Sequence, residues 1–565
     1  MTTEKHWLKS YPAGVPETID PAQYSSLNHL FDESFSKYAE RPAYVCMDKQ
    51  MNYSELDACS RHLAAWLQQR GLAKGARVAV MMPNVLQYPV AVTAILRAGC
   101  TVVNINPLYT PRELEHQLRD AGVEAIFILE NFAITLEKVL QQTSVKHVVV
   151  ASIGDMMGSL NGALMNLVVR KVKKLVPSFS LPGSISFRTA LAQGAKLSLQ
   201  AVPVTHTDIA FLQYTGGTTG LSKGATLTHR NVIANMLQND AWAGPTMRHE
   251  AAQGALVTVC ALPLYHILAL NACMLMGMRW GAMNVLIPNP RDMPGFVKEL
   301  AKYRVNFFPG VNTLFNGLLN QPAFAKLDFS GLRITLGGGM AVQEVVSDRW
   351  CKVTGSPILE GYGLSETSPT ATLCPPDQNG FSGTIGLPVP STEVAILNDD
   401  GEPVPFGQAG EIAIRGPQVM TGYWNRPDET AKVMTDSGYF KSGDVGIMDE
   451  RGYVKIVDRK KDMILVSGFN VYPNEIEAVI AAHPDVLECA CVGVSDAVSG
   501  EAVKLFVVKK NPALTTDQLM DYCKQQLTAY KKPKYIEFRQ SLPKTNVGKI
   551  LRRELRDTVQ VATTQ

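Results

Sequence analysis

Short apolar segments and amphipathic helical segments alternate through the first 150 residues, and this alternation limits the folds open to the chain. Residues 52–71 have a helical pattern, because Asn52 and Glu55 can form a capping box and apolar residues repeat at helical spacing. Strands that alternate with helices predict an α/β fold, with mainly parallel sheets flanked by helices. The later segments of this pattern are strand-like at 78–82, 101–105, 125–129 and 145–151 and helical at 110–121.

The last hundred residues have a different pattern, which predicts a small α+β domain. Before them stands the charge run Asp458-Arg-Lys-Lys-Asp462, which has the composition of a solvated linker. The chain has 565 residues, enough for about three or four units of about 150 residues each. We therefore expect a large N-terminal domain with several subdomains at 1–457, a hinge linker at 458–462 and a mobile C-terminal domain at 463–565. The pattern of that last domain is helix 474–483, strands 487–494 and 502–509, helix 515–527 and strand 535–538.

Composition excludes several classes of protein. Fifty-four basic and fifty-one acidic residues give a net charge of +3, too balanced for a nucleic-acid-binding protein. The ten cysteines are scattered, and neither a Cys-x-x-Cys nor a His-Glu-x-x-His motif occurs, so we expect reduced thiols and no zinc site. Residues 1–11 contain charges and no apolar run, so no signal peptide is predicted and the expected location is the cytoplasm.

Two segments bear on membrane contact. Residues 262–278 carry no formal charge but contain proline, histidine and asparagine, which is a poor pattern for a spanning helix. Residues 160–176 combine leucines and valines with Arg170, Lys171, Lys173 and Lys174. Such a helix either lies on an anionic membrane surface or packs on the protein core. A peripheral contact with the inner face of the cytoplasmic membrane therefore stays open.

The segment Tyr214-Thr-Gly-Gly-Thr-Thr-Gly-Leu-Ser-Lys-Gly224 directly follows an apolar run of strand type. Its glycines let backbone N–H groups turn toward an anion, its threonines add hydroxyl donors, and Lys223 adds a positive charge. It is not a Walker loop, because Ser222 stands where that motif needs glycine. The segment predicts a phosphate-binding loop, and a flexible glycine-rich turn is the plainer alternative.

Three other segments are ambiguous when each is taken alone. The run Gly337-Gly338-Gly339 is either a tight exit from a strand or a close approach of backbone to a flat ligand such as adenine. The segment 360–367, which contains Tyr362, Glu366 and Thr367, offers an aromatic face, a carboxylate and a hydroxyl for a base and magnesium. His266 is either a buried structural histidine or a functional one.

Five motifs occur together in one order, and that order resembles the adenylate-forming superfamily of acyl-CoA synthetases, luciferases and adenylation domains. The segment from Ser437 to Asp462 is similar to the signature of the fatty-acyl-CoA synthetase family, and segments 106–118 and 466–477 resemble its bacterial long-chain members, which supply β-oxidation. The resemblance runs from end to end of the chain. The motifs are 214–224, 361–367, 442–444, 458–462 and 543–549.

The resemblance implies an activity and a role for each candidate residue. A fatty acid would react with ATP to give an acyl-adenylate, and the acyl group would then pass to coenzyme A. Lys549 would bridge the carboxylate and the α-phosphate, Lys461 would be the hinge, and His266 would lie in the catalytic site. The other implied roles are phosphate binding for Thr215, Gly216, Gly217, Thr218, Thr219, Gly220 and Lys223, Mg²⁺ for Glu366, α-phosphate for Thr367, adenine for Gly338, Gly339, Tyr362 and Gly363, ribose for Asp444 and Arg459, and the CoA path for Ser467 and Gly468.

Departures from the family pattern leave several points open. Some members place a gating tryptophan at the position of Leu270, and many have proline at the position of Ser222. The methionine-rich segment 268–286 either lines an acyl tunnel or belongs to the core. Two rival functions are an acyl-AMP ligase that serves a carrier protein and a silent, membrane-associated fatty-acid-binding protein; the presence of Lys549, Glu366 and Asp444 argues against the second. The oligomeric state is open, with a homodimer as one arrangement.

Overall fold

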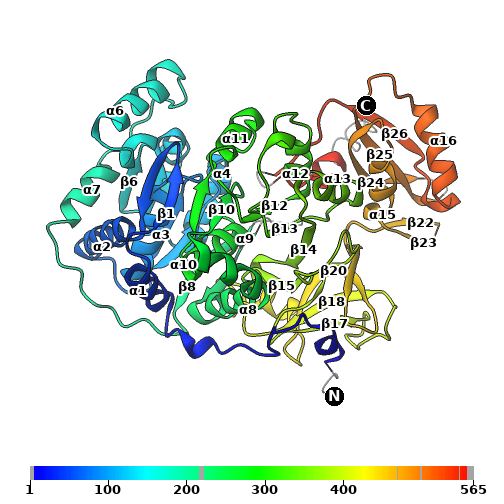
Figure 1. Cartoon of the computed structure of the whole chain (residues 1–565), viewed down its shortest axis with the longest axis horizontal. Coiled ribbons are helices and arrows are strands. Elements are labelled where there is room, and N and C mark those ends of the chain that lie inside the picture. The colour runs from blue at the N-terminus through cyan, green and yellow to red at the C-terminus, as the bar shows by residue number, and fades with distance from the viewer. Residues whose placement is uncertain (1–4, 216–221, 468, 497–498, 546–547, 557–565) are drawn as a thin grey trace.

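The computed structural model describes residues 5–215, 222–467, 469–496, 499–545 and 548–556. A large unit holds two long sheets and a shorter one, and a small unit lies at the C-terminal side, coloured orange to red in Figure 1. This is the predicted α/β fold class, with a smaller C-terminal unit, and it is confirmed.

The first long sheet has eight strands among the described residues, and those at its centre are parallel. The predicted strands at 78–82, 101–105, 125–129 and 145–151 all lie in it and are confirmed. An antiparallel pair, β8 and β9, leads to the sheet's edge and frames the phosphate loop. In spatial order the strands are β19 (Gly422–Tyr423), β9 (Lys223–Thr228), β8 (Ile209–Thr215), β4 (Thr101–Asn104), β3 (Arg77–Met81), β5 (Ala125–Leu129), β6 (His147–Ala151) and β7 (Ile185–Ser186).

The second long sheet has nine strands in the described part of the chain and is also parallel through its centre. Its strands β13 and β14 carry the two glycine-containing motifs side by side, since Gly338 is paired with Gly361. In spatial order the strands are β16 (Leu387–Pro388), β15 (Thr370–Leu373), β14 (Ile358–Gly363), β13 (Ile334–Gly338), β12 (Phe307–Gly310), β10 (Val257–Cys260), β11 (Met283–Leu286), β1 (Pro42–Cys46) and β2 (Lys49–Asn52).

Helices cover the sheets and complete the core of the large unit. Every residue of α3 (Gln87–Arg97) is buried, as expected for a helix enclosed on all sides. The helix predicted at 52–71 is confirmed as α2 (Tyr53–Gln69), with the Asn52/Glu55 capping box in place. Further helices are α1 (Leu27–Lys37), α4 (Pro111–Ala121), α6 (Ser159–Leu167), α7 (Phe187–Gly194), α8 (His229–Gln253), α9 (Ile267–Ala269), α10 (Met276–Trp280), α11 (Met293–Leu300), α12 (Asn312–Leu319), α13 (Glu344–Thr354) and α14 (Pro427–Val433).

A four-stranded antiparallel sheet leads from the large unit to the small one. Its strands are β17 (Glu393–Leu397), β18 (Gly410–Arg415), β20 (Phe440–Met448) and β21 (Val454–Arg459). The small unit then has the predicted α+β order, which is confirmed. It contains β22 (Ile464–Val466), β23 (Phe469–Val471), α15 (Pro473–Ala481), β24 (Val486–Asp496), β25 (Gly500–Lys509), α16 (Thr516–Gln526) and β26 (Tyr535–Arg539).

The two segments with a bearing on membranes have distinct structures. Residues 262–278 form a loop, α9, a π-helical turn and the start of α10, and most of their side chains are buried. Residues 159–172 form α6 and a π-helical extension. Within the described residues, no helix combines the length and the apolar character that crossing a bilayer requires.

Candidate active site

The phosphate loop connects two paired strands. Strands β8 and β9 are antiparallel, and Thr215 is paired with Lys223 at the base of the loop. The structure therefore brings the first and last predicted phosphate residues together. The remaining predicted members, Gly216, Gly217, Thr218, Thr219 and Gly220, lie outside the described residues.

Lys223 is held by partners that come later in the chain. Its Nζ makes an ion pair with the carboxylate of Glu429, on α14, and lies 5.0 Å from the centre of the Tyr423 ring. The ammonium of Lys223 lowers the pKa of Glu429 to about 2. The lysine predicted to hold phosphate therefore already has an anionic partner in the large unit, and phosphate would compete with Glu429 for it.

Glu366, the predicted magnesium ligand, is buried beside the same elements. The hydroxyl of Tyr423 donates a hydrogen bond to its Oε1 at 2.7 Å, and its backbone carbonyl accepts from the Met420 N–H at 2.7 Å. Burial raises the pKa of this carboxyl. Because β19 pairs with β9, Tyr423 connects Glu366 to the strand that carries Lys223.

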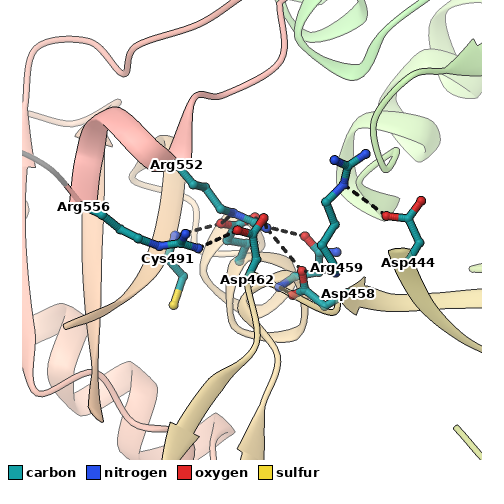
Figure 2. Close-up of polar contacts among 9 residues, drawn as sticks. Asp444, Asp458, Arg459, Asp462, Cys491, Arg552 and Arg556 are labelled. Atoms are coloured by element: carbon teal, nitrogen blue, oxygen red, sulfur yellow. Dashed lines mark hydrogen bonds and ion pairs between the residues drawn. The ribbon is translucent and has the colours of Figure 1, made fainter. Parts of the chain in front are cut away.

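The residues predicted to bind adenine lie at the ends of β13 and β14, and those predicted to bind ribose lie in β20 and at the end of β21. Gly339 has φ of +75°, which favours glycine. A Cβ on Gly363 would stand 1.7 Å from the carbonyl oxygen of Pro369, so the backbone there is too close for any side chain. The Tyr362 hydroxyl donates to Asp444 Oδ2 at 2.7 Å, and Arg459 Nε lies 3.1 Å from Asp444 Oδ1. Figure 2 shows the Arg459–Asp444 pair.

Thr367, the residue predicted to contact the α-phosphate, is hydrogen-bonded within its own turn. Its side chain is fully buried, and its hydroxyl lies among backbone groups of its own turn. The Leu364 N–H donates to Thr367 Oγ1 at 2.9 Å, and this hydroxyl also contacts the carbonyl of Pro369. The side chain that the resemblance directs toward the α-phosphate is thus engaged in fixing the 364–367 turn.

Lys549 comes to the site from the small unit. The turn before it packs against α12, because the hydroxyl of Thr313 donates to the Gly548 carbonyl at 3.3 Å. Gly548 has φ of +81°, and a Cβ there would stand 2.4 Å from Thr313 Oγ1. Burial, followed by the charge of Arg459, lowers the pKa of Lys549 to about 8. The structure therefore brings together Lys549 and the nucleotide-side residues.

His266 has both a structural role and a place in the site. Its Nδ1 accepts from the Leu268 N–H at 3.3 Å, which caps α9. Burial, and then the charge of Lys549, lowers the pKa of His266 to about 4. The imidazole is therefore neutral at pH 7, and it lies close enough to Lys549 for the ammonium to disfavour its protonation.

An apolar cavity lies beside β13, the strand that ends in the glycine turn, since Ile334 and Leu336 line it. At the turn itself, a Cβ on Gly338 would stand 3.3 Å from Leu268 Cδ2, so Leu268 packs against the glycine. The cavity itself has a volume of about 40 Å³. Ala272, Met276 and Trp280 of the methionine-rich segment line it, whereas Met274 and Leu270 are core residues. Its other walls are Asn239, Trp242, Ala243, Phe307, Ile334, Leu336, Leu359, Leu373, Cys374 and Pro376.

The predicted hinge residue lies near this centre, whereas the predicted CoA-path residue Ser467 lies outside it; the charges of Lys461 and Lys549 act on each other. Lys461 has an exposed side chain and stands two residues after the end of β21. Ser467 is exposed, has φ of +50° and lies between β22 and β23, two strands labelled at the lower edge of the small unit in Figure 1. Gly468 lies outside the described residues. The structure thus brings Lys549 to the nucleotide side and leaves Ser467 at a distance from it.

Comparison with known proteins identifies the family. Residues 31–424 match the AMP-binding enzyme family, and residues 475–549 match the AMP-binding enzyme C-terminal domain. The long-chain-fatty-acid–CoA ligase of Escherichia coli O6:H1 (strain CFT073) is 56% identical over 555 residues, which are 98% of each chain. The chain belongs to the AMP-binding enzyme family.

Solved structures of AMP-binding enzymes have the same fold. An anthranilate CoA ligase, AuaEII, in complex with anthranoyl-AMP matches with a TM-score of 0.84 at 23% identity, over 97% of this chain and all of its own. An ATP-bound MatB from Rhodopseudomonas palustris matches with a TM-score of 0.81 at 29% identity, over 95% of this chain and 99% of its own. The match therefore includes both units of the AMP-binding fold.

Several contacts of this AMP-binding enzyme were not foreseen from its motifs. Tyr423 bonds to Glu366, Glu429 pairs with Lys223, and Thr313 contacts Gly548. The segment Gly422-Tyr-Trp-Asn-Arg-Pro427 offered a weak signal, since two aromatic side chains and a helix-starting proline stand close together in it. The positions of the partners, however, are far apart in sequence.

Proposed function

We propose that this chain is a long-chain-fatty-acid–CoA ligase, which converts a fatty acid, ATP and CoA to acyl-CoA, AMP and diphosphate. The observation that carries this conclusion is the 56% identity to a ligase of that name over 98% of both chains. The geometry supports it, because the chain has a lysine with a lowered pKa beside Arg459 and Asp444, paired strands at the base of a phosphate-type loop, and an apolar cavity.

In the first step, a carboxylate oxygen of the fatty acid attacks the α-phosphorus of ATP. The bond from that phosphorus to the bridging oxygen breaks, diphosphate leaves, and acyl-AMP remains. Lys549 would hold a positive charge where negative charge accumulates on the carboxylate and the α-phosphate. Its surroundings support this role, since Arg459 adds a further positive charge beside it. Thr215 and Lys223 would bind the β- and γ-phosphates, and Thr367 would keep the turn beside the α-phosphate in shape.

Glu366 fits the magnesium ion that accompanies ATP. Mg²⁺ is usually held by one or two carboxylates together with phosphate oxygens and water, and Glu366 is a buried carboxylate joined through Tyr423 to the strand of Lys223. When bound, the ion would neutralise charge on the departing diphosphate. Glu366 would hold the ion, and Tyr423 would orient the carboxylate.

The nucleoside would lie between the glycine turn and the Tyr362 ring. Gly338 and Gly339 leave room for a flat base, and Tyr362 offers an aromatic face. Asp444 accepts a hydrogen bond from Tyr362 and pairs with Arg459. Its carboxylate is therefore already held in position for the ribose hydroxyls to bind. Gly363 keeps the backbone of this turn close to Pro369.

In the second step, the CoA sulfur attacks the acyl carbonyl carbon. The carbon–oxygen bond to AMP breaks, AMP leaves, and the thiol proton passes to solvent. In this second step Lys549 would stand in the way of the thiol, so the small domain would first turn about Lys461. That turn would carry Ser467 and Gly468 toward the CoA path. The exposed position of Ser467 supports such a movement.

The acyl chain would enter the cavity beside β13, with His266 at its mouth. A space of about 40 Å³ holds about one water molecule, so a long chain needs the lining side chains to move. Met276 can do so, because an unbranched thioether has several rotatable bonds. The methionine-rich segment would then serve in part as tunnel wall and in part as core.

The test of the function is a measurement of AMP release with acids from acetate to oleate, with and without CoA. We expect sustained release only with CoA and with the long acids. Release that proceeds to completion without CoA but with a carrier protein would indicate the carrier-protein ligase. Tight fatty-acid binding without AMP release would indicate the silent binding protein.

A matched pair of substitutions tests the acyl cavity. Ala272 lines it and is nearly fully buried, so Ala272→Phe should fill it while Ala272→Ser hardly changes its volume. We expect the phenylalanine variant to lose activity on oleate more than tenfold and to keep its activity on short acids. Equal activity of both variants on oleate would place the acyl chain elsewhere.

A peripheral membrane contact through α6 is the second part of the proposal. Leu160, Leu164 and Leu167 are 84%, 61% and 55% exposed, and Val172 and Leu175 extend the same apolar surface. The opposite side of α6 is tied to the body, since Gly162 packs against the Gly154 carbonyl. Figure 1 shows α6 at the outer end of the large unit. Five exposed apolar side chains next to lysines suit an anionic lipid surface.

The basic part of this surface consists of one ion-paired arginine and three exposed lysines. The Arg170 side chain is 47% exposed, and its Nε donates to the buried Glu130 at 2.8 Å while its guanidinium also reaches Ser152. Lys171, Lys173 and Lys174 are exposed cations. Because Arg170 also serves the buried Glu130, the three lysines are the positions to change in a test of lipid binding.

Co-sedimentation with anionic and with neutral lipid vesicles tests this contact. Changing Lys171, Lys173 and Lys174 to glutamate should weaken co-sedimentation with anionic vesicles, most at low salt. A control with Lys298, Lys326 and Lys352 changed to glutamate has the same net charge, but those side chains lie elsewhere on the surface. An equal loss of co-sedimentation in both variants would show that net charge, and not the position of these lysines, causes the effect.

Three further assignments complete the proposal. Long-chain acyl-CoA is the substrate form for fatty-acid degradation, so the product would supply β-oxidation. The contact with lipid would take place at the cytoplasmic side of the membrane. The chain would act either as a monomer or as a homodimer, and light scattering on the full chain distinguishes the two.

A further inference from the structure

A cluster of charged side chains surrounds Arg552 at the junction of the two units (Figure 2). Arg552 is mostly buried, with 14% of its side chain exposed. Its Nη2 lies 2.7 Å from Glu477 Oε2, its Nε donates to Glu477 Oε1 at 3.1 Å, and its Nη1 lies 3.3 Å from Asp458 Oδ1. Arg552 therefore joins two carboxylates that come from different parts of the molecule.

The two carboxylates belong to different units. Asp458 is in β21, where it is paired with Val445 of β20 in the sheet of the large unit. Glu477 is in α15 of the small unit. Asp458 Oδ2 also accepts the N–H of Asn474, in the first turn of α15, at 2.8 Å. One fully buried carboxylate of the large unit thus receives an arginine and a helix N-terminus of the small unit.

Ion pairs hold the residue before Lys461 on the large unit and the residue after it on the small unit. Before it, Lys460 Nζ lies 2.7 Å from Asp399 Oδ1 of the large unit. After it, Asp462 lies 3.4 Å from Arg552 and 2.5 Å from Arg556, both of the small unit. Rotation about Lys461 would therefore leave Asp458 behind and carry Arg552 and Asn474 away from it.

Such a rotation has an electrostatic cost at Asp458. Burial raises the pKa of Asp458 to about 6, and Arg552 opposes that rise. Without Arg552 and the Asn474 N–H, the carboxylate would keep the backbone N–H of Arg459 and would have to take up water or a proton. The cluster therefore stabilises the present arrangement of the units relative to a rotated one.

We propose that Arg552 and Asp458 form an interdomain latch, which holds the small unit where Lys549 reaches the nucleotide side and which opens before the thioester step. The inference rests on the proposed two-step function. Lys549 stands three residues before Arg552, and Gly548, the residue directly before Lys549, packs on Thr313. Fixing Arg552 on Asp458 thus fixes the position of Lys549. Arg552 is a positioning residue here, since its contacts are with protein carboxylates.

The test compares the two half-reactions in Arg552→Gln and Asp458→Asn. Single-turnover acyl-AMP formation is measured with ATP and oleate, and thioester formation is measured separately with synthetic oleoyl-AMP and CoA. We expect acyl-AMP formation to fall about tenfold in both variants and thioester formation to stay equal or to rise. Arg552→Lys should restore part of the first rate, because it keeps the charge.

Arg556→Gln is the matched control, since it removes an ion pair of the same cluster that does not reach Asp458. Its two half-reactions should stay within about twofold of the wild type. Asp458→Asn keeps the Arg552–Glu477 pair inside the small unit, so it remains informative if Arg552→Gln does not fold. If the wild type is active and Asp458→Asn has the same ratio of the two rates, the latch is wrong and the proposed function stands. A wild type that forms no acyl-AMP would remove the proposed function and the latch together.

Discussion

The two lysines of the site differ in what surrounds them. Lys223 lies on strand β9 and pairs with Glu429, and both belong to the large unit. Lys549 lies on a turn of the small unit, where burial and the neighbouring cations Arg459, Lys461 and Arg552 lower its pKa, against a single opposing contribution from Asp444. Lys223 therefore has a fixed partner, whereas Lys549 is placed among like charges.

This difference teaches how one site can serve two reactions. A lysine with its own carboxylate has a counter-ion even when no nucleotide is bound. A lysine among cations is stabilised by a polyanion such as ATP and is less stable there once diphosphate has left. We infer that the large-unit half of the site acts in both steps and that the small-unit half acts in one. The predictions below test this division.

The largest expected effect is that of Lys549→Ala on the first step. Loss of one preorganised charge at a developing anion costs about 3 kcal/mol, or roughly 10² in rate, so acyl-AMP formation should fall at least that far. The thioester step should survive nearly unchanged, because it would take place with Lys549 moved away. The measurement supplies either ATP and fatty acid or synthetic acyl-AMP and CoA. Failure of both steps in a folded variant would contradict the division.

Lys461→Pro should have the opposite selectivity. Proline fixes φ at about −65° and so hinders rotation of the backbone at the proposed pivot. We expect acyl-AMP formation to continue and thioester formation to slow more than tenfold. Single-turnover rates of the two steps provide the measurement. An equal fall in both rates with an intact fold would show that position 461 is not the pivot.

Asp444→Ala tests the half of the site that should act in both steps. The substitution removes the acceptor of Tyr362 and the partner of Arg459. A hydrogen bond to a charged group contributes about 1.5–3 kcal/mol, so both half-reactions should slow about tenfold or more. Asp449→Ala is a control, because that aspartate pairs with Arg451 on the surface. A loss confined to one step would assign Asp444 to that step alone.

The smallest expected effect is a pH dependence of the first step. The pKa of Lys549 is lowered from 10.5 to about 8, so the free enzyme loses the ammonium as pH rises through 8. Because the charged form is the active one, kcat/KM for acyl-AMP formation should fall to about half of its plateau at pH 8 and continue downward above it. Lys549→Arg keeps its charge and should move this decline to higher pH. If kcat/KM fell at the same pH in the arginine variant, the decline would belong to the titration of another group.

Local patterns predicted much of the fold. Helix α2 followed from its capping box and apolar spacing, and β3, β4, β5 and β6 followed from short apolar segments between helices. These features depend on neighbours within a few residues, so the sequence displays them directly. The same holds for the glycines of β13 and β14, whose backbone requirements are local.

The partners of the site residues could not be predicted in this way. Tyr423 and Glu366 are 57 residues apart, Lys223 and Glu429 are 206 apart, and Arg552 and Asp458 are 94 apart. No period of helix or strand relates such positions. The pairing of Arg170 could not be predicted for the same reason, since its buried partner Glu130 lies 40 residues earlier.

The sequence by itself thus determined the fold class, the family and the kinds of side chain available for the chemistry. Motif order and local periodicity suffice for these, because they record backbone and side-chain requirements within short segments. Only the tertiary structure decided that Lys223 has a carboxylate partner, that Lys549 stands among cations, and that Asp458 receives Arg552. The reason is that the sequence gives the charge of a side chain, whereas its burial and its neighbours depend on how distant segments pack together.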